Sequence, residues 1–280
     1  MITKTHLTDL LEELRLVEYD AAQVKDFPGY AALLDAMLNN IGDANPHLRD
    51  MLIYRTFCEF TTRGLLDSEQ WRIILARALD QEHLFYCIGA QESDSVFTRS
   101  FSALLLPLAL YQNDQRPWLS ADQITSIGET VISYINQEKD FRGYVPDKGW
   151  AHAPAHIADA IAALATTKRI ISDHLTQSLF DSCLALIINP GEVFVAKEGD
   201  RIASAVAALI ESSTLDPQYV ITKLNDIQDI ANSWAPDNFP ISFNRHINYT
   251  NFLMTLYFQL QGVSVGSEIL STITELLSGS

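Results

Sequence analysis

The chain has 280 residues, of which 48% are hydrophobic, and it carries a formal charge of −16 with a pI of about 4.7. This length fits one large domain or two small ones, with enough apolar residues for a continuous core. The acidic balance argues against a nucleic-acid groove, which needs a basic surface, and against binding to an anionic membrane. We therefore expect neither nucleic acid nor membrane as a partner, while a cationic, zwitterionic or neutral partner suits the charge.

The cysteines and the N-terminal sequence narrow the class of protein further. Cys58, Cys87 and Cys183 are far apart and form no CxxC motif, so neither a thiol zinc site nor a disulfide framework is predicted. The first residues lack the basic-then-apolar pattern of a signal peptide. No apolar run approaches the roughly 20 residues of a membrane helix. The simplest prediction is a cytoplasmic protein.

Apolar residues recur at helical spacing along most of the chain, which predicts an all-α protein. Gly, Pro and Asn separate the periodic segments, and no low-complexity linker divides the chain. In the first half, helices are predicted over 7–16, 30–38, 48–60, 68–79, 96–108 and 124–135. In the second half, they are predicted over 156–167, 172–188, 200–212, 216–234, 243–260 and 267–277.

The segment that begins at Asp43 is a helical hairpin of about 40 residues, which is the size of a HEAT repeat. Its opening turn, from Asp43 to Asp50, resembles the turn of such repeats. Repeats of this size stack because one hairpin alone cannot bury its apolar face. We predict a single all-helical domain over residues 1–280, built as an α-superhelix of stacked antiparallel hairpins of the HEAT or ARM type. An α/α-barrel of paired helices is the alternative.

The segment from Asp140 to Asp159 differs from the amphipathic helices around it, because it combines Gly, Pro, aromatic, basic and histidine residues. The run from Pro146 to Gly149 predicts a tight turn, since Pro fixes φ and Gly accepts a positive φ. Pro154 is tolerated in the first turn of a helix. A helix is therefore predicted to start near residues 150–153, and we expect a functional site in this segment.

Two histidines and an aspartate near that helix start are the candidate catalytic residues. His152, His156 and Asp159 are spaced i, i+4 and i+7, so they are expected on one helix face. They could bind a divalent transition metal such as zinc, iron or manganese. They could also act as acid and base groups without a metal, or form structural hydrogen bonds to the loop. The glutamate of the HExxH metalloprotease motif is absent, because Ala153 takes its place.

Basic and aromatic residues of the same segment are the candidate ligand-binding residues. Arg142 and Lys148 flank the predicted helix N-terminus, an arrangement that suits an anion. Tyr144 and Trp150 could stack on a ligand, and Arg99 could approach from an earlier helix. In the alternative interpretation, the two basic residues pair with nearby aspartates and pin the loop, and the aromatic residues anchor it.

Two other polar stretches of the sequence could lie close to this segment in the folded protein. The stretch from Asp94 to Arg99 combines a helix cap with an acid and a base, and it is equally typical of a structural role. The stretch from Asn244 to His246 gathers polar residues at a later helix start, where a simple exposed helix end also explains them.

Several short segments along the chain form a recognisable pattern: Leu48-Arg49-Asp50, residues 94–101, 138–145, 148–152 and 155–156, Asp200-Arg201-Ile202-Ala203 and Leu256-Tyr257-Phe258. In these segments the chain resembles an uncharacterised family of bacterial proteins that is classed as a domain of unknown function. The resemblance implies a helical protein and brings no activity with it. One position departs from the pattern, because Met254 stands where an arginine is expected, which weakens any anion contact by that late helix.

Two functions therefore follow from the sequence. The first is a non-catalytic helical-repeat protein that binds a peptide, a protein or a small anionic ligand at a concave site around residues 140–159. The second is a hydrolase, metal-dependent or histidine-based, in which His152, His156 and Asp159 act on a substrate anion held by Arg142 and Lys148. Fold alone does not decide between them.

Overall fold

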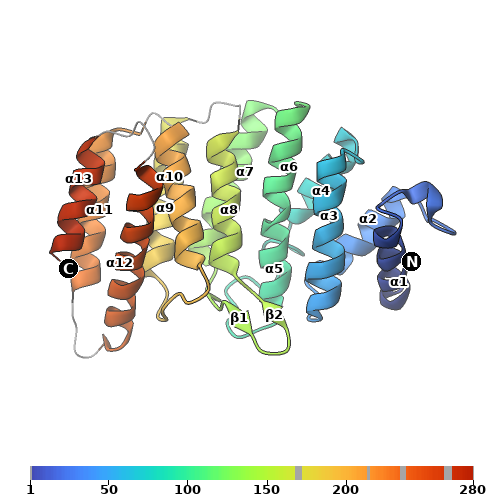
Figure 1. Cartoon of the computed structure of the whole chain (residues 1–280), viewed down its shortest axis with the longest axis horizontal. Coiled ribbons are helices and arrows are strands. Elements are labelled where there is room, and N and C mark those ends of the chain that lie inside the picture. The colour runs from blue at the N-terminus through green and yellow to red at the C-terminus, as the bar shows by residue number, and fades with distance from the viewer. Residues whose placement is uncertain (1, 168–171, 213–214, 234–237, 262–266, 280) are drawn as a thin grey trace. The chain divides into compact units, whose positions relative to one another are not determined.

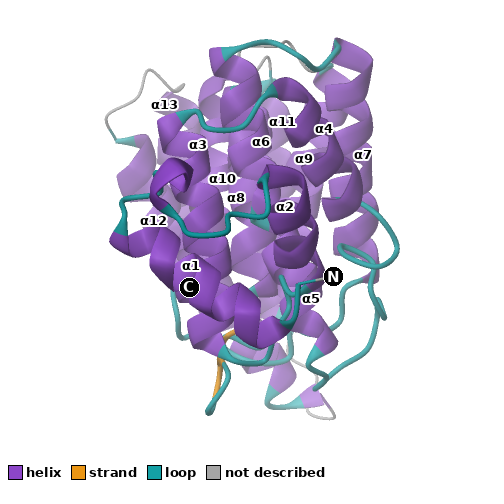
Figure 2. Cartoon of the chain, turned by 90° about the vertical axis from the view of Figure 1, so that its right-hand side faces the viewer, coloured by secondary structure: helices purple, strands orange, loops and turns teal. Residues whose placement is uncertain are grey.

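The computed structural model describes residues 2–167, 172–212, 215–233, 238–261 and 267–279. In these residues the protein is helical apart from one short two-stranded hairpin, as Figures 1 and 2 show. The predicted all-α class is therefore confirmed. A search of the same residues for a helix long and apolar enough to cross a bilayer finds none.

The chain divides into two compact units. Unit 1 comprises Met1–Leu119 and Gln137–His156, and unit 2 comprises Ser120–Asn136 and Ile157–Ser280. The single domain expected from the sequence stays a prediction, as does the choice between an α-superhelix and an α/α-barrel.

Unit 1 contains the N-terminal helices and the strand hairpin. Helix α1 packs on α2, helix α3 continues the preceding π-helix, and α6 packs on α3, α4 and α5. Its elements are α1 (Lys4–Leu16), η1 (Ala21–Gln23), α2 (Tyr30–Asn39), η2 (His47–Tyr54), α3 (Arg55–Arg63), α4 (Ser68–Ala78), α5 (Ser95–Ala103), α6 (Leu105–Gln115), β1 (Tyr144–Val145) and β2 (Gly149–Trp150).

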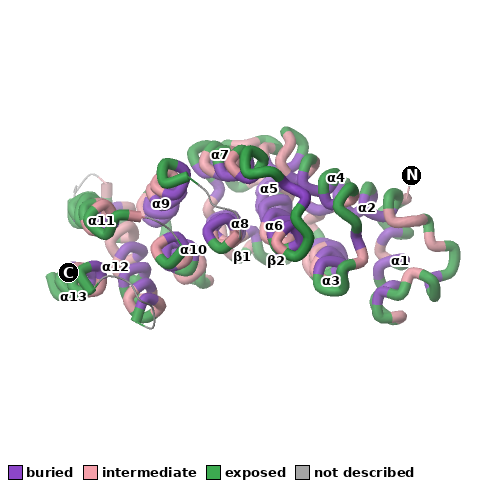
Figure 3. Tube along the Cα trace, turned by 90° about the horizontal axis from the view of Figure 1, so that it is seen from above, coloured by how far each residue is buried: buried purple, intermediate pink, exposed green. Residues whose placement is uncertain are grey.

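Unit 2 arranges its helices in two layers. Figure 3 shows α9 and α11 in one row and α10 and α12 in the other, with buried residues where the rows meet. Helix α9 contacts α10, α11 and α12, and α13 packs on α11 and α12. The later helices are α7 (Ala121–Gln137), α8 (Ala153–Thr166), α9 (Asp173–Ile188), α10 (Glu198–Ser212), α11 (Pro217–Asn232), α12 (Ile241–Leu260) and α13 (Ser267–Ser278).

Local sequence explains where several helices begin and end. The Asp67 side chain accepts from the backbone of Gln70, and the Gln70 side chain bonds back to Asp67, which forms a capping box before α4. Ser172 and Asp216 cap α9 and α11 with their side-chain oxygens. Gly64 ends α3 with φ of 63°, the left-handed conformation that glycine adopts most readily.

Three local features differ from the sequence prediction. The helix expected over 96–108 breaks at Leu104, because Pro107 has no N–H to donate and fits only the first turn of the new helix α6. The segment from His47 to Tyr54 is a π-helix rather than part of a regular α-helix. The expected turn at 146–149 carries short strands on both sides. Trp234, the predicted end of α11, lies outside the described residues.

Candidate functional site

The β1–β2 hairpin presents different side chains to its two sides. Tyr144 lies opposite Trp150, and Val145 lies opposite Gly149, in an antiparallel register. Because side chains alternate across a strand, one pair faces solvent and the other faces the protein. The Tyr144 and Trp150 side chains are 58% and 42% exposed, whereas Gly149 is buried. Val145 packs against a small apolar cluster that includes Phe97.

Arg49 holds the inner side of the hairpin. Its buried guanidinium donates to the Lys148 carbonyl over 2.6 Å, to the Asp43 carbonyl and to the Asp50 carboxylate. The same group lies over the Phe97 ring, 4.2 Å from its centroid. Charged hydrogen bonds and cation–π contact together satisfy the buried cation. Sequence reasoning missed this role, which joins residues 99 positions apart.

Gly149 makes the approach of Arg49 feasible. Its φ is 80°, and a Cβ atom at this position would lie 3.0 Å from Pro46 Cβ and 3.2 Å from Arg49 Nη2. The absence of a side chain therefore serves both the turn conformation and the close contact with the residues beneath.

Arg99 is a structural residue in the interior of unit 1. Its side chain is 0% exposed and pairs with Glu138 through two bonds of 2.6 and 2.8 Å. It also donates to the carbonyls of Tyr86 and Ala90. Glu138 in turn accepts from the backbone N–H of Asp140. This buried pair ties α5 to the start of the central segment, and the ligand contact expected of Arg99 stays a prediction.

Arg142 and Lys148 are also paired with carboxylates. Arg142 donates to both oxygens of Asp140 over 2.7 and 2.6 Å and to the Ser93 carbonyl. Lys148 Nζ lies 2.7 Å from both oxygens of Asp94. Of the two interpretations drawn from the sequence, these contacts support the one in which both cations pin the loop.

The protein environment shifts the pKa of three of these side chains. Burial lowers the pKa of Arg49, with Asp50 opposing that shift. Burial raises the pKa of Asp50, and Arg49 opposes it. The hydrogen bonds that Arg142 donates to the Asp140 carboxylate raise the pKa of Arg142, which stabilises its charged form. These directions are typical of ion pairs that hold structure, although active sites use the same physics.

The candidate histidines lie side by side in unit 1. His152 has φ of 51° and precedes α8, and its carbonyl accepts from the His156 N–H over 2.9 Å. The predicted helix start is therefore confirmed at Ala153. The two imidazole rings lie 5.8 Å apart and nearly perpendicular.

Asp159, the third candidate, belongs to unit 2. It accepts from Arg201 Nε over 2.6 Å and also from Arg201 Nη2. Across the part of the chain that the structure describes, no group of three or more His, Cys, Asp or Glu side chains is placed to hold a metal ion. The expected metal site therefore has no support from this geometry.

A chain of aromatic rings leads from the hairpin surface into unit 1. Tyr144 meets Trp150 edge to face at 5.0 Å, and Trp150 stacks on His152 at 4.4 Å. His152 meets His156, whose ring lies 5.2 Å from that of Phe101. Each ring is thus positioned by the next, and the exposed pair is supported from below.

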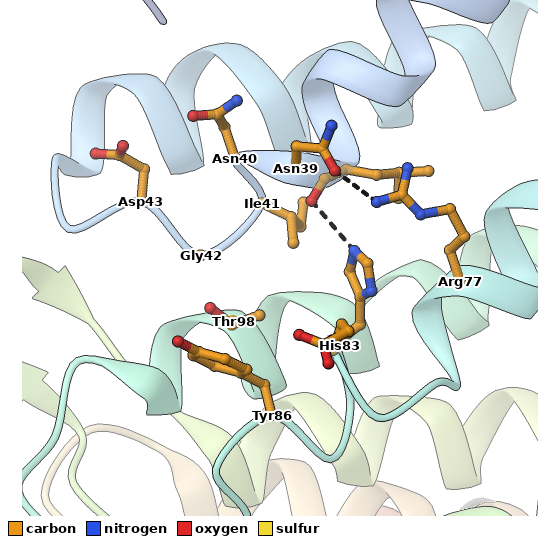
Figure 4. A pocket seen from close by; sticks show the side chains of 11 residues that line it. Asn39, Asn40, Ile41, Gly42, Asp43, Arg77, His83, Tyr86 and Thr98 are labelled. Carbon is orange, nitrogen blue, oxygen red and sulfur yellow. Dashed lines mark hydrogen bonds between the residues drawn. The ribbon is translucent and has the colours of Figure 1, made fainter.

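A cavity of about 450 Å³ lies elsewhere in unit 1 and was not predicted. Figure 4 shows the 40–43 loop on one side and Thr98, Tyr86 and His83 on the other. Gly42 lies so close to Thr98 that a side chain there would collide with it.

The basic side chains around this cavity bond to other protein groups. His83 contacts the Leu38 carbonyl and the Asp80 carboxylate, and Arg77 donates to Asp35 and Asn39. We assign the cavity no function, because these groups are already satisfied by protein partners.

The late polar cluster makes local contacts within unit 2. Asn244 donates to the Gly191 carbonyl over 2.7 Å, and the His246 ring lies 3.1 Å from Asn232 Oδ1. These bonds fix the start of α12, and the expected convergence of this cluster with the central segment stays a prediction.

Residues 84–258 match the model of a family described as a protein of unknown function (DUF2785). The match covers more than half of the chain, and it contains Arg99, the β1–β2 hairpin and both histidines. No curated protein and no solved structure matches the chain. The chain belongs to the DUF2785 family.

Proposed function

We propose that this member of the DUF2785 family is a binding protein that docks a peptide segment of a partner protein on Tyr144 and Trp150, here called the aromatic pair. One observation carries the proposal: two large aromatic side chains are exposed next to each other, with ring centroids 5.0 Å apart. Tyr and Trp dominate binding energy at protein interfaces because they offer large, rigid contact areas.

The backbone beneath the aromatic pair is held in place before any partner binds. Arg49 bonds to the Lys148 carbonyl, Lys148 pairs with Asp94, and Ala151 N–H donates to the Gly143 carbonyl. Association costs less when the binding groups are already ordered. A rigid hairpin with exposed rings is therefore suited to recognition.

The contacts favour a peptide over the small anionic ligand that the sequence also suggested. An anion site needs cationic groups that are not neutralised, and both Arg142 and Lys148 are bonded to carboxylates. Unit 2, with its two helix layers, is in keeping with HEAT-like hairpin stacking, an architecture that commonly binds peptides and proteins.

A hydrolase remains the second candidate. The neighbouring rings of His152 and His156 support it, because paired imidazoles can share acid and base roles. Asp159 is bonded to Arg201, so it is less suited to orient either ring. We therefore rank binding above catalysis.

Selection from a displayed library of random peptides of about 12 residues tests the proposal. Selected peptides should bind wild type and lose at least about tenfold affinity for a Tyr144→Leu/Trp150→Leu variant, as expected when central aromatic residues are removed. Tyr111→Leu is the matched control, because Tyr111 is a similarly exposed tyrosine on α6. Equal affinity for wild type and the double variant would contradict the proposal.

A further inference from the structure

We infer that the aromatic pair receives a cationic side chain, arginine or lysine, of the partner peptide. This inference rests on the proposed function and adds the chemical class of the residue that is recognised. Two features of the described residues carry it: the exposed ring surfaces, and the Asp147 carboxylate in the turn of the hairpin, which no basic side chain pairs.

The rings provide a surface that attracts cations. The planes of Tyr144 and Trp150 are 73° apart, and both residues are exposed, although one face of Trp150 is stacked on His152. A cation within about 6 Å of an aromatic centroid is attracted by the ring's negative face. The protein uses this contact in its own interior, where the Arg49 guanidinium lies over Phe97 and Phe101.

The charges around the hairpin favour a cation over an anion. Asp147 lies in the turn between the two strands and has no ion-pair or hydrogen-bond partner among the described residues. Lys139 also lacks an ion pair within that part of the chain, but it precedes the hairpin, next to the Glu138–Asp140 cluster. The other basic residues are paired: Arg49 with Asp50, Arg99 with Glu138, Arg142 with Asp140 and Lys148 with Asp94.

The net charge of the chain also favours a cationic peptide. At −16, the protein attracts cationic peptides over the range of the Debye length and repels anionic ones. This long-range attraction does not direct the peptide to one particular surface of the protein. The aromatic pair supplies a short-range contact at the hairpin, next to the Asp147 carboxylate.

The experiment compares blocked heptapeptides in which glycine alternates with one other residue. That residue is arginine, citrulline, lysine or proline, so each peptide presents a single kind of side chain. Citrulline is the neutral analogue of arginine, so it isolates the effect of charge. Binding is followed by NMR through the indole N–H signal of Trp150, which a Trp150→Phe variant identifies. The titrations are made at about 0.15 M salt, where long-range attraction is screened beyond about 8 Å.

We expect the arginine peptide to shift the Trp150 signal and the citrulline peptide to bind at least about fivefold more weakly. Tyr144→Leu should weaken arginine-peptide binding about two- to fivefold, the size of one exposed cation–π contact, while Tyr144→Phe keeps the ring and the affinity. Asp147→Asn should also weaken binding of the arginine peptide, because it removes the negative charge in the turn. Tyr111→Leu should bind as wild type does.

Three results would overturn the inference. Equal binding of the arginine and citrulline peptides would show that charge is not recognised. Equal binding of the arginine peptide to wild type and Tyr144→Leu would show that the Tyr144 ring is not needed. Binding would then reflect only the general attraction of a cationic peptide to an acidic protein. Binding of the proline peptide alone would leave the hairpin as a docking surface for a different side chain, so the proposed function would survive without this inference. If the library also yields no hairpin-dependent peptide, both fail.

Discussion

The two sides of the β1–β2 hairpin differ in what they contribute. The inner side is held by Gly149, Val145 and the buried guanidinium of Arg49, and every contact there is with the protein itself. The outer side presents Tyr144 and Trp150 to solvent. Charged residues of the central segment therefore hold the structure, whereas the two aromatic residues are exposed and carry the proposed binding function. Charge in a sequence motif does not by itself identify a binding site.

The largest effect is expected from Arg99. Arg99→Ala leaves the buried Glu138 carboxylate without its cationic partner, so it should lower the free energy of unfolding by about 3–5 kcal/mol in urea titrations. The Arg99→Leu/Glu138→Leu variant removes both charges and should recover a large part of that loss. A cost below about 1 kcal/mol for Arg99→Ala would contradict a structural role for the pair.

The second-largest loss of stability is expected at Gly149, and Gly64 provides a matched control. Gly149→Ala forces a side chain into a positive φ, which costs about 1–2 kcal/mol, and also pushes a Cβ against Pro46 and Arg49. Gly64→Ala meets the same backbone strain with no atom within 4 Å of the new Cβ. The loss of unfolding free energy should be larger for Gly149→Ala, and equal losses would show that the contact with Arg49 is unimportant.

A smaller effect is expected at Lys148. Its pair with Asp94 is exposed, with 40% and 49% of the two side chains accessible, so Lys148→Ala should cost less than about 1 kcal/mol in the same titrations. The variant should also become less sensitive to added salt than wild type, because salt screens exposed pairs. A loss above about 2 kcal/mol would place the pair among the principal supports of the hairpin.

Phosphate should have almost no effect on stability. A ligand that binds only the native state raises the melting temperature. Because Arg142 is bonded to Asp140 and Ser93, we expect phosphate to shift the melting temperature of wild type no more than that of Arg142→Ala. A specific rise in wild type alone would restore the anion site that the sequence suggested.

Much of the helical structure was predictable because it depends on local sequence. The starts of α9 and α11 follow from Ser172 and Asp216, and the end of α3 follows from Gly64. The hairpin was recognised only as a turn, because strands of two residues carry no periodic signal. The break before α6 follows from Pro107, but a continuous apolar run concealed it.

The contacts of the candidate site were not predictable from the sequence. The bond from Arg49 to the Lys148 carbonyl joins distant segments, and no local pattern indicates it. The sequence also carries no sign that Arg99 pairs with Glu138, because the two residues lie 39 positions apart. The spacing of His152 and His156 did predict that they are neighbours, because i and i+4 positions meet at a helix start.

The affinity of one library-selected peptide for Tyr144→Leu, measured beside Tyr111→Leu and wild type, tests the central claim most directly. We predict that Tyr144→Leu binds the peptide more weakly while its free energy of unfolding stays within about 0.5 kcal/mol of wild type, as is usual for exposed positions. Tyr111→Leu should match wild type in both measurements. Full affinity in Tyr144→Leu would contradict the claim, because the peptide would then bind elsewhere on the protein.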